Sequence, residues 1–363
     1  MKKSLKNKSA LSVNNGIEQP PSVDENAVKK FKTRKKKLLT VNEYVTGIKK
    51  GDITILSQAI TLIESSLITH HNLAQEIIEK CLPYSGNSIR IGITGVPGVG
   101  KSTFIETFGK EITNKGKKLA VLAIDPSSER SKGSILGDKT RMEELSIDTN
   151  AYIRPSPSAG TLGGVARKTR ETIILCESAG FDTIFIETVG VGQSETAVHS
   201  MVDFFLLLML AGAGDELQGI KRGIMEMADM IAITKSDGEN IGKTKLAARE
   251  YKNALHFFPP TPSGWEQKVV LCSAISKAGI NDIWENIIKY HKLTLDNNYF
   301  NIRRKEQAKY WMYQSINEQL KSNFYNHPDI SAKLSMYEND VMNKKISPFI
   351  AAKKLLNYYF NNK

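Results

Sequence analysis

Residues 95–102, Gly-Val-Pro-Gly-Val-Gly-Lys-Ser, constrain the fold more than any other segment of this chain. They match the pattern G-x-x-x-x-G-K-[ST], in which glycines let backbone N–H groups turn toward phosphate oxygens. A strand-like segment, residues 88–94, precedes the pattern, and a helix-like segment, residues 103–108, follows it. This order predicts a phosphate-binding loop at the N-terminus of a helix, whose dipole favours an anion. The chain is therefore expected to bind a nucleotide.

The predicted loop contains two side chains with distinct tasks. Lys101 would bring a positive charge to the terminal phosphates, and the hydroxyl of Ser102 would reach Mg²⁺. The backbone of the loop and of the first helical turn would bind the phosphate chain. The residues predicted to do so are Gly95, Val96, Pro97, Gly98, Val99, Gly100, Lys101, Ser102 and Thr103.

The length of the chain and the distribution of its charge indicate how many domains it can form and whether it binds nucleic acid or membranes. The 363 residues can form one large domain with additions. Of the net charge of +12, a share of +8 lies in residues 1–39, which are rich in Lys, Ser, Asn and Pro. Such a composition indicates a flexible tail, so we expect neither a nucleic-acid partner nor membrane association. The N-terminus lacks the apolar stretch of a secretory signal and contains acidic residues, so we expect a cytoplasmic protein rather than one of the mitochondrial matrix.

Alternating strand and helix patterns between residues 88 and 291 predict an α/β domain with a mostly parallel sheet. Most of the strand candidates lack polar alternation, as strands buried on both faces do. They are residues 88–94, 119–125, 182–188, 203–210, 230–235 and 269–273. Around this domain we expect a basic tail at 1–38, a helical extension at 39–87 and a second helical extension at 292–363. The last of these either packs on its own domain or forms a dimer arm.

Acidic residues follow several of these strands, and ligands gather at the carboxyl ends of parallel strands. Glu187 would hold Mg²⁺ directly or through water. The N–H of Gly190 would reach the γ-phosphate, and Gln193 is a candidate to orient a water molecule. Asp125 or Asp138, or both, could reach the metal, although either could simply cap local structure. The metal ligands predicted are Ser102, Asp125, Asp138 and Glu187, and the catalytic residues are Lys101, Asp125, Asp138 and Glu187.

The residues Thr234-Lys235-Ser236-Asp237 end a strand where guanine-binding proteins carry N-K-x-D. A carboxylate at Asp237 accepts hydrogen bonds from N1–H and the 2-amino group of guanine, which adenine cannot donate, so GTP is favoured over ATP. The stem of Lys235 can lie across the base. The backbone of Ser273-Ala274, after the next strand, would meet the guanine carbonyl. Thr234 lacks the amide that normally ties this loop to the phosphate loop, so we expect looser binding with the same base preference.

Longer strings around these motifs resemble one known family. They are Gly-Ile-Thr-Gly-Val-Pro-Gly-Val-Gly-Lys-Ser-Thr at 92–103, Asp-Pro-Ser-Ser at 125–128, Gly-Asp-Lys-Thr-Arg-Met at 137–142, Glu-Thr-Val-Gly-Val-Gly-Gln-Ser-Glu at 187–195, and residues 212–223. The chain is similar to the methylmalonyl-CoA mutase-associated GTPases (MeaB/ArgK-like, with mitochondrial MMAA-type relatives). The resemblance implies a P-loop GTPase core of the SIMIBI type with N- and C-terminal helical extensions, a homodimer, and Mg²⁺-dependent hydrolysis of GTP to GDP and phosphate.

The same resemblance implies a partner. Members of the family assist adenosylcobalamin-dependent acyl-CoA mutases: they gate cofactor loading, protect the mutase and help expel damaged cofactor. No cobalamin site is inferred in this chain itself. Segment 212–223 matches the switch that relays nucleotide state, with Asp215, Gln218 and Lys221 as the signalling residues.

Two other functions stay open on the sequence alone. One is a metallochaperone GTPase. Such proteins usually carry clustered His or Cys ligands, so the six scattered histidines of this chain argue against this function. The other is a transport-linked kinase, which would need a base for the acceptor hydroxyl.

Overall fold

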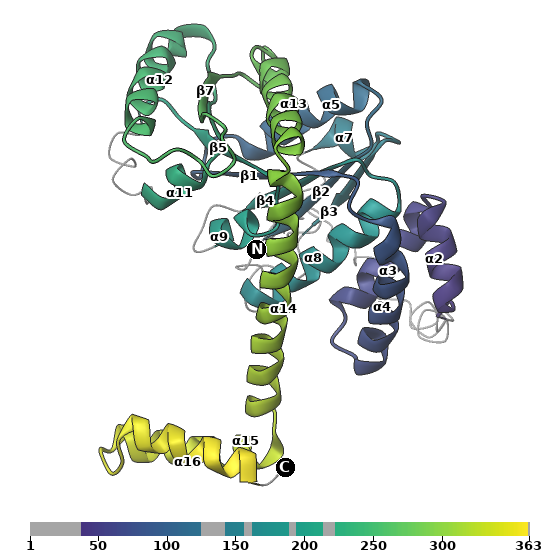
Figure 1. The fold of residues 1–363 in the computed structure, drawn as a ribbon, viewed down its shortest axis with the longest axis vertical. Coiled ribbons are helices and arrows are strands. Elements are labelled where there is room, and N and C mark those ends of the chain that lie inside the picture. Colours follow the sequence, from purple (N-terminus) through teal and green to yellow (C-terminus); the bar gives the residue numbers. More distant parts are fainter. Residues whose placement is uncertain (1–37, 125–141, 156–161, 189–193, 213–221, 362–363) are drawn as a thin grey trace, which may run out of the picture. The chain divides into compact units, whose positions relative to one another are not determined.

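The computed structural model describes residues 38–124, 142–155, 162–188, 194–212 and 222–361 (Figure 1). The chain divides into a short N-terminal unit, residues 1–40, and a second unit, residues 41–363, which contains every helix and strand described. The predicted basic tail, residues 1–38, lies almost wholly outside the described residues, and the predicted domain boundaries stay a prediction. None of the described helices is both long and apolar enough to span a bilayer.

A seven-stranded sheet forms the centre of the second unit, and all its strand pairs are parallel. The strand order is β3-β2-β4-β1-β5-β6-β7. The strands are β1 (Ile89–Gly95), β2 (Leu119–Ile124), β3 (Ala151–Arg154), β4 (Thr183–Thr188), β5 (Phe204–Met209), β6 (Met230–Ile233) and β7 (Lys268–Leu271). This confirms the predicted α/β class. The strand that leads into the phosphate-binding motif is central, since β1 pairs with β4 on one side and with β5 on the other.

One strand, β3, was not predicted from the sequence. It has only four residues, the first and last of which are half-buried, and it lies at the edge of the sheet beside β2. A strand this short offers too few positions for alternation or a long apolar run to be recognised. By contrast, the apolar run that begins at Phe204 is fully buried along β5, as predicted for a strand covered on both faces.

Helices cover both faces of the sheet. Ile89, Ile91 and Ile93 of β1 pack in one core with Phe104 and Phe108 of α5 (Lys101–Asn114) and with apolar residues of α13 (Ile280–Asp296). A Cβ on Gly92, which points to the opposite face, would meet Phe205, Val198 and Val202, so α9 (Ser194–His199) lies there. The isoleucines of β1 thus pack with α5 and α13 on one face of the sheet, and Gly92 leaves room for Val198 of α9 on the other.

The remaining helices extend this core. The N-terminal extension consists of α2 (Val41–Lys49), α3 (Ile53–Glu64) and α4 (Ile68–Cys81), which pack on α8 (Leu162–Ser178). The C-terminal extension consists of α14 (Tyr299–Tyr325), α15 (Pro328–Met342) and α16 (Pro348–Asn361) (Figure 1). The other elements are the short helices η1 (Leu82–Tyr84), α7 (Glu143–Ser146), α11 (Arg222–Met227) and η2 (Gly238–Asn240), and α12 (Ile241–Leu255), which packs on β6 and β7.

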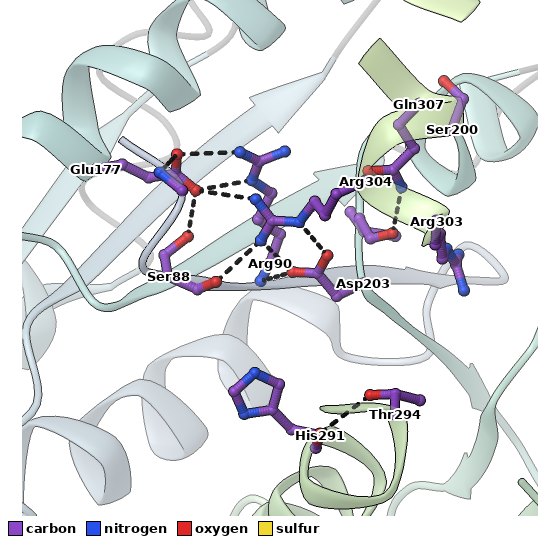
Figure 2. Close-up of polar contacts among 12 residues, drawn as sticks. Ser88, Arg90, Glu177, Ser200, Asp203, His291, Thr294, Arg303, Arg304 and Gln307 are labelled. Carbon is purple, nitrogen blue, oxygen red and sulfur yellow. Dashed lines mark hydrogen bonds and ion pairs between the residues drawn. The ribbon is translucent and has the colours of Figure 1, made fainter. Parts of the chain in front are cut away.

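A buried ionic network fixes the start of α14 to the sheet (Figure 2). The guanidinium of Arg90 donates to both carboxylate oxygens of Glu177, at 2.9 and 3.0 Å, and Arg304 of α14 pairs with Asp203. Burial raises the pKa of both carboxylates, but the attraction of Arg90 and Arg304 outweighs it and holds each pKa below its usual value. The network connects β1, α8, the residue before β5, and α14.

A second set of contacts joins α14 to the end of α9. Gln307 donates its amide to the Val202 carbonyl at 2.7 Å, and the indole N–H of Trp311 donates to the Ser200 carbonyl at 3.0 Å. Arg303 contacts Nε2 of His199 at 3.2 Å. Burial, together with the positive charge of Arg303, lowers the pKa of His199 to about 4, so its ring is neutral near pH 7 and accepts the hydrogen bond.

We predict that His199→Gln reduces the pH dependence of stability. The pKa of His199 falls from 6.5 to about 4 on folding, so between these pH values the unfolded state binds more protons than the folded state. The free energy of unfolding is therefore unaffected by protonation of His199 above pH 6.5 and decreases as the pH falls toward 4. The glutamine oxygen can still accept from Arg303 but does not titrate. Between about pH 7 and pH 5 the wild type should lose about 2 kcal/mol more of its free energy of unfolding than the variant. Denaturant unfolding at both pH values measures this, and equal losses would contradict the assignment.

Candidate nucleotide-binding site

The predicted site segments meet at one edge of the sheet. The phosphate loop follows β1, Glu187 lies at the end of β4, Lys235 and Asp237 follow β6, and Ser273 follows β7. Because all these strands run parallel, their carboxyl ends share this edge, where ligands of open α/β sheets bind. The sheet therefore brings together residues that lie far apart in the chain.

The phosphate loop begins at Gly95, the last residue of β1, which pairs with Leu208 of β5. A Cβ on Gly95 would lie 2.5 Å from the Leu208 carbonyl oxygen, so only glycine fits at this point of the sheet. The loop then turns into α5 through Gly100, and the N–H of Val99 donates to the Val96 carbonyl at 3.2 Å. The first turn of α5 presents its N–H groups beside this loop, as an anion site requires.

Lys101 lies over the loop that precedes it. Its ammonium donates to the carbonyl oxygens of Gly95 at 2.7 Å and Val96 at 3.4 Å. Burial lowers the pKa of Lys101, while the negative charges of Glu187 and Glu195 raise it and partly offset the cost of burial. The lysine is thus a cation held inside the loop by carbonyl dipoles and two nearby carboxylates.

The predicted metal side of the site lies at the ends of β1 and β4 and the start of α5. Glu187 is buried, with 7% of its surface exposed, and Ser102 lies in the first turn of α5. The hydroxyls of Thr94 and Thr188 are 2.8 Å apart and join the two strands beside them. A serine hydroxyl and a carboxylate are hard oxygen donors, which Mg²⁺ prefers, so the described residues fit that ion.

The predicted base side consists of two loops, after β6 and after β7, that bond to each other. The hydroxyl of Ser273 donates to a carboxylate oxygen of Asp237, and the N–H of Ser236 donates to the Cys272 carbonyl at 3.0 Å. The Ser236 hydroxyl also lies 2.9 Å from that of Thr244 in α12. These contacts hold the Asp237 carboxylate in one orientation, as a base-reading group requires.

The expectation that Thr234 leaves the base loop without its tie to the phosphate loop is wrong, whereas the looser binding expected from it stays a prediction. The Thr234 hydroxyl is buried and donates to the Val99 carbonyl of the phosphate loop at 2.9 Å. Lys235, whose φ is 55°, donates its ammonium to the Gly98 carbonyl at 2.9 Å. The hydroxyl thus supplies the tie that an amide makes in the N-K-x-D pattern. The residue type alone does not reveal this, because the tie depends on how close the phosphate loop lies.

Several predicted site residues lie outside the described residues. They are Asp125, Asp138, Gly190, Gln193, Asp215, Gln218 and Lys221. Their assignments stay predictions. Conversely, Thr94, Thr188 and Glu195 belong to the site's surroundings and were not identified from the sequence. For the two threonines the available signal was their position at the ends of strands that flank the phosphate loop.

The fold and this site define a P-loop GTPase. The family model "Methylmalonyl Co-A mutase-associated GTPase MeaB" matches residues 56–329, and the chain belongs to this family. As a member, it is a GTPase linked to methylmalonyl-CoA mutase.

Relatives and a solved structure agree with this assignment. The chain is 47% identical to "Methylmalonic aciduria type A homolog, mitochondrial" of Mus musculus over 87% of this chain and 79% of the relative. It is 42% identical to "GTPase ArgK" of Escherichia coli over 87% of this chain and 96% of that protein. The crystal structure of a protein named "LAO/AO transport system kinase" superposes with a TM-score of 0.71 at 35% identity, covering 89% of this chain and 99% of that one.

We predict that Thr234→Val weakens binding of GDP about tenfold, because the buried Val99 carbonyl loses its donor. Preference for guanine over adenine should persist, since Asp237 and Ser273 are unchanged. Titration with a fluorescent GDP analogue, in competition with unlabelled GDP and ADP, measures both quantities. Thr234→Ser should bind like the wild type.

A matched control for this experiment is Thr172→Val, whose hydroxyl bonds to the Lys168 carbonyl within α8. Wild-type affinity in Thr234→Val, or an equal loss in the serine variant, would show that the hydroxyl does not hold the loop.

Proposed function

We propose that this GTPase is a chaperone of a B12-dependent acyl-CoA mutase, with methylmalonyl-CoA mutase as the first candidate. In this proposal it gates the loading of adenosylcobalamin and protects or reactivates the mutase. Family membership over residues 56–329 supports the choice of partner. The proposal that the chain binds GTP rests on one observation: the base loop bonds directly to the phosphate loop through Thr234 and Lys235. A cytoplasmic location is part of the same proposal.

The phosphate half of the site would work by charge and position. Lys101 would hold the terminal phosphates, because it already lies inside the loop with its charge balanced by nearby carboxylates. Ser102 and Glu187 would hold Mg²⁺, with Asp125 and Asp138 as further candidates. When bound, the ion would neutralise charge on the phosphates. The N–H of Gly190 would contact the γ-phosphate.

The base half would select GTP. Asp237, oriented by Ser273, would accept from N1–H and the 2-amino group of guanine. The stem of Lys235 passes beside the loop, with its Cε 3.9 Å from the Cβ position of Gly100, and would cover the base. The backbone at Ser273 and Ala274 would meet the guanine carbonyl.

Communication with the mutase would use segment 212–223, with Asp215, Gln218 and Lys221 as signalling residues. Its end continues into α11, which contacts α9. The described part of this region therefore adjoins the helix that follows Glu187.

We also propose a homodimer that uses the C-terminal extension. The α15–α16 pair has its own small core of Ile330, Leu355 and Tyr359. Large apolar side chains on α14, α15 and α16 remain exposed, among them Tyr313, Leu320, Met342, Phe349 and Phe360. Exposed apolar residues on consecutive helices are typical of a surface that a protein partner covers.

One alternative has a specific observation in its favour. The solved structure that superposes at a TM-score of 0.71 is that of a protein named as a transport system kinase. A kinase would transfer the γ-phosphoryl group to a protein hydroxyl, whereas a GTPase transfers it to water. Incubation with γ-labelled nucleotide separates the two, because only a kinase leaves label on an acceptor protein.

We predict that Asp237→Asn shifts preference from GTP toward XTP. The amide can donate to the 2-oxo group of xanthine, whereas the carboxylate accepts from the 2-amino group of guanine. The ratio of GTP to XTP affinity should fall by about 100-fold or more, since both a gained and a lost hydrogen bond contribute. Competition binding with GTP, XTP and ATP measures it, and unchanged GTP selectivity would remove Asp237 from the base site.

The partner is tested by GTP turnover with and without purified methylmalonyl-CoA mutase. We predict that the mutase raises turnover, and that nucleotide state in return changes mutase binding, because coupled binding equilibria are reciprocal. Lys101→Ala should abolish hydrolysis under both conditions.

Two variants probe the relay within this assay. Asp215→Ala and Lys221→Ala should keep basal turnover but respond less to the mutase. Stimulation like that of the wild type would place the relay elsewhere, and a mutase that neither binds nor stimulates the wild type would overturn the chaperone proposal.

A further inference from the structure

A threonine of the phosphate-binding helix reaches the loop that follows β7. The Thr107 hydroxyl of α5 donates to the Ala274 carbonyl at 3.1 Å, across 167 positions of sequence. Both residues are half-buried, so water competes only partly for this bond. Neither the phosphate motif nor the base-loop motif contains Thr107.

The loop reached by Thr107 has a fixed shape of its own. The N–H of Ser273 donates to the Ala278 carbonyl at 3.0 Å, and the N–H of Ser276 donates to the Ser273 hydroxyl at 3.1 Å. At its end, a Cβ on Gly279 would lie 2.1 Å from the Leu271 carbonyl oxygen, so the loop closes tightly against β7. A bond to one of its carbonyls therefore positions the loop as a whole rather than bending one residue.

The helix that carries Thr107 is anchored at the other half of the site. Thr107 lies six residues after Lys101, which corresponds to about 9 Å along the helix axis. Phe104 and Phe108, on either side of it, are fully buried against the sheet, and Phe108 stacks on Phe185 with ring centroids 5.1 Å apart. One rigid helix thus spans the distance from the phosphate loop to the base loop.

We propose that Thr107 is a positioning residue for guanine recognition. By fixing Ala274 it sets where the backbone N–H groups of this loop meet the oxygen at position 6 of the base. The inference rests on the proposed guanine site and adds a division of tasks to it. Asp237 reads positions 1 and 2 of the base, whereas Thr107, acting through Ala274, governs discrimination at position 6.

If Asp237 and Thr107 divide base recognition in this way, loss of the Thr107 hydroxyl should change the affinities for GDP, IDP and ADP differently. Guanine and hypoxanthine both carry an acceptor oxygen at position 6, and adenine carries an amino group there. Guanine and hypoxanthine differ only in the 2-amino group, which Asp237 reads. A loss confined to position 6 therefore weakens GDP and IDP equally and leaves ADP unchanged.

The test compares Thr107→Val with the wild type by competition binding of GDP, IDP and ADP. We expect GDP and IDP to bind about fivefold to tenfold more weakly, with their ratio unchanged and ADP affinity unaffected. Turnover at saturating GTP should stay at the wild-type level, so that KM changes without kcat. Thr107→Ser retains the hydroxyl and should restore GDP and IDP affinity.

Thr169→Val is the matched control, since that hydroxyl bonds to the Val165 carbonyl within α8. An equal loss for all three nucleotides in Thr107→Val would indicate a structural role and overturn the inference, as would wild-type GDP affinity or failure of Thr107→Ser to restore it. If the wild-type protein itself binds ADP as tightly as GDP, the proposed guanine site fails, and this result is distinct from failure of the Thr107 variant alone.

Discussion

The nucleotide site depends on the central position of β1. This strand is paired on both sides, and at its end Gly95 approaches the Leu208 carbonyl of β5 too closely for any side chain. The chain leaves the sheet after Gly95, between the carboxyl ends of β4 and β5. Every other group of the site is placed relative to this exit: Glu187 at the end of one neighbour, and the base loops beyond the other.

The opposite end of β1 is held by charge. Arg90, Glu177, Asp203 and Arg304 form one buried network in which each carboxylate contacts a guanidinium (Figure 2). Breaking one partner of such a network leaves an uncompensated charge, at a cost of about 3 to 5 kcal/mol. Because Arg304 belongs to α14, the network makes the C-terminal extension part of the core at its start, while a separate set of apolar contacts holds α15 to α16.

The parts of this structure that could be predicted from the sequence are those set by neighbouring residues. The phosphate loop, the buried strands and the base-loop motif each occupy a few consecutive positions, and the sheet carries them to one edge. The ties of Thr234 to Val99 and of Thr107 to Ala274 join positions 135 and 167 apart, and nothing in the local pattern marks either hydroxyl as a donor. From the sequence, Thr234 suggested that the tie between the base loop and the phosphate loop is missing. A pattern of residue types does not show that the Val99 carbonyl lies within reach of its hydroxyl.

These hydroxyl ties have a consequence for how the two nucleotide states can differ. Together with the bond from the Lys235 ammonium to Gly98, they fix the base loops to the phosphate loop and to α5, so the groups expected to bind base and phosphates form one braced unit. A structural difference between the GTP and GDP states would then be expressed outside this braced unit. The first described helix after Glu187, α9, ends in contacts to α14 through His199 and Ser200. The C-terminal extension is thus physically attached to the first described helix that follows Glu187 in the chain.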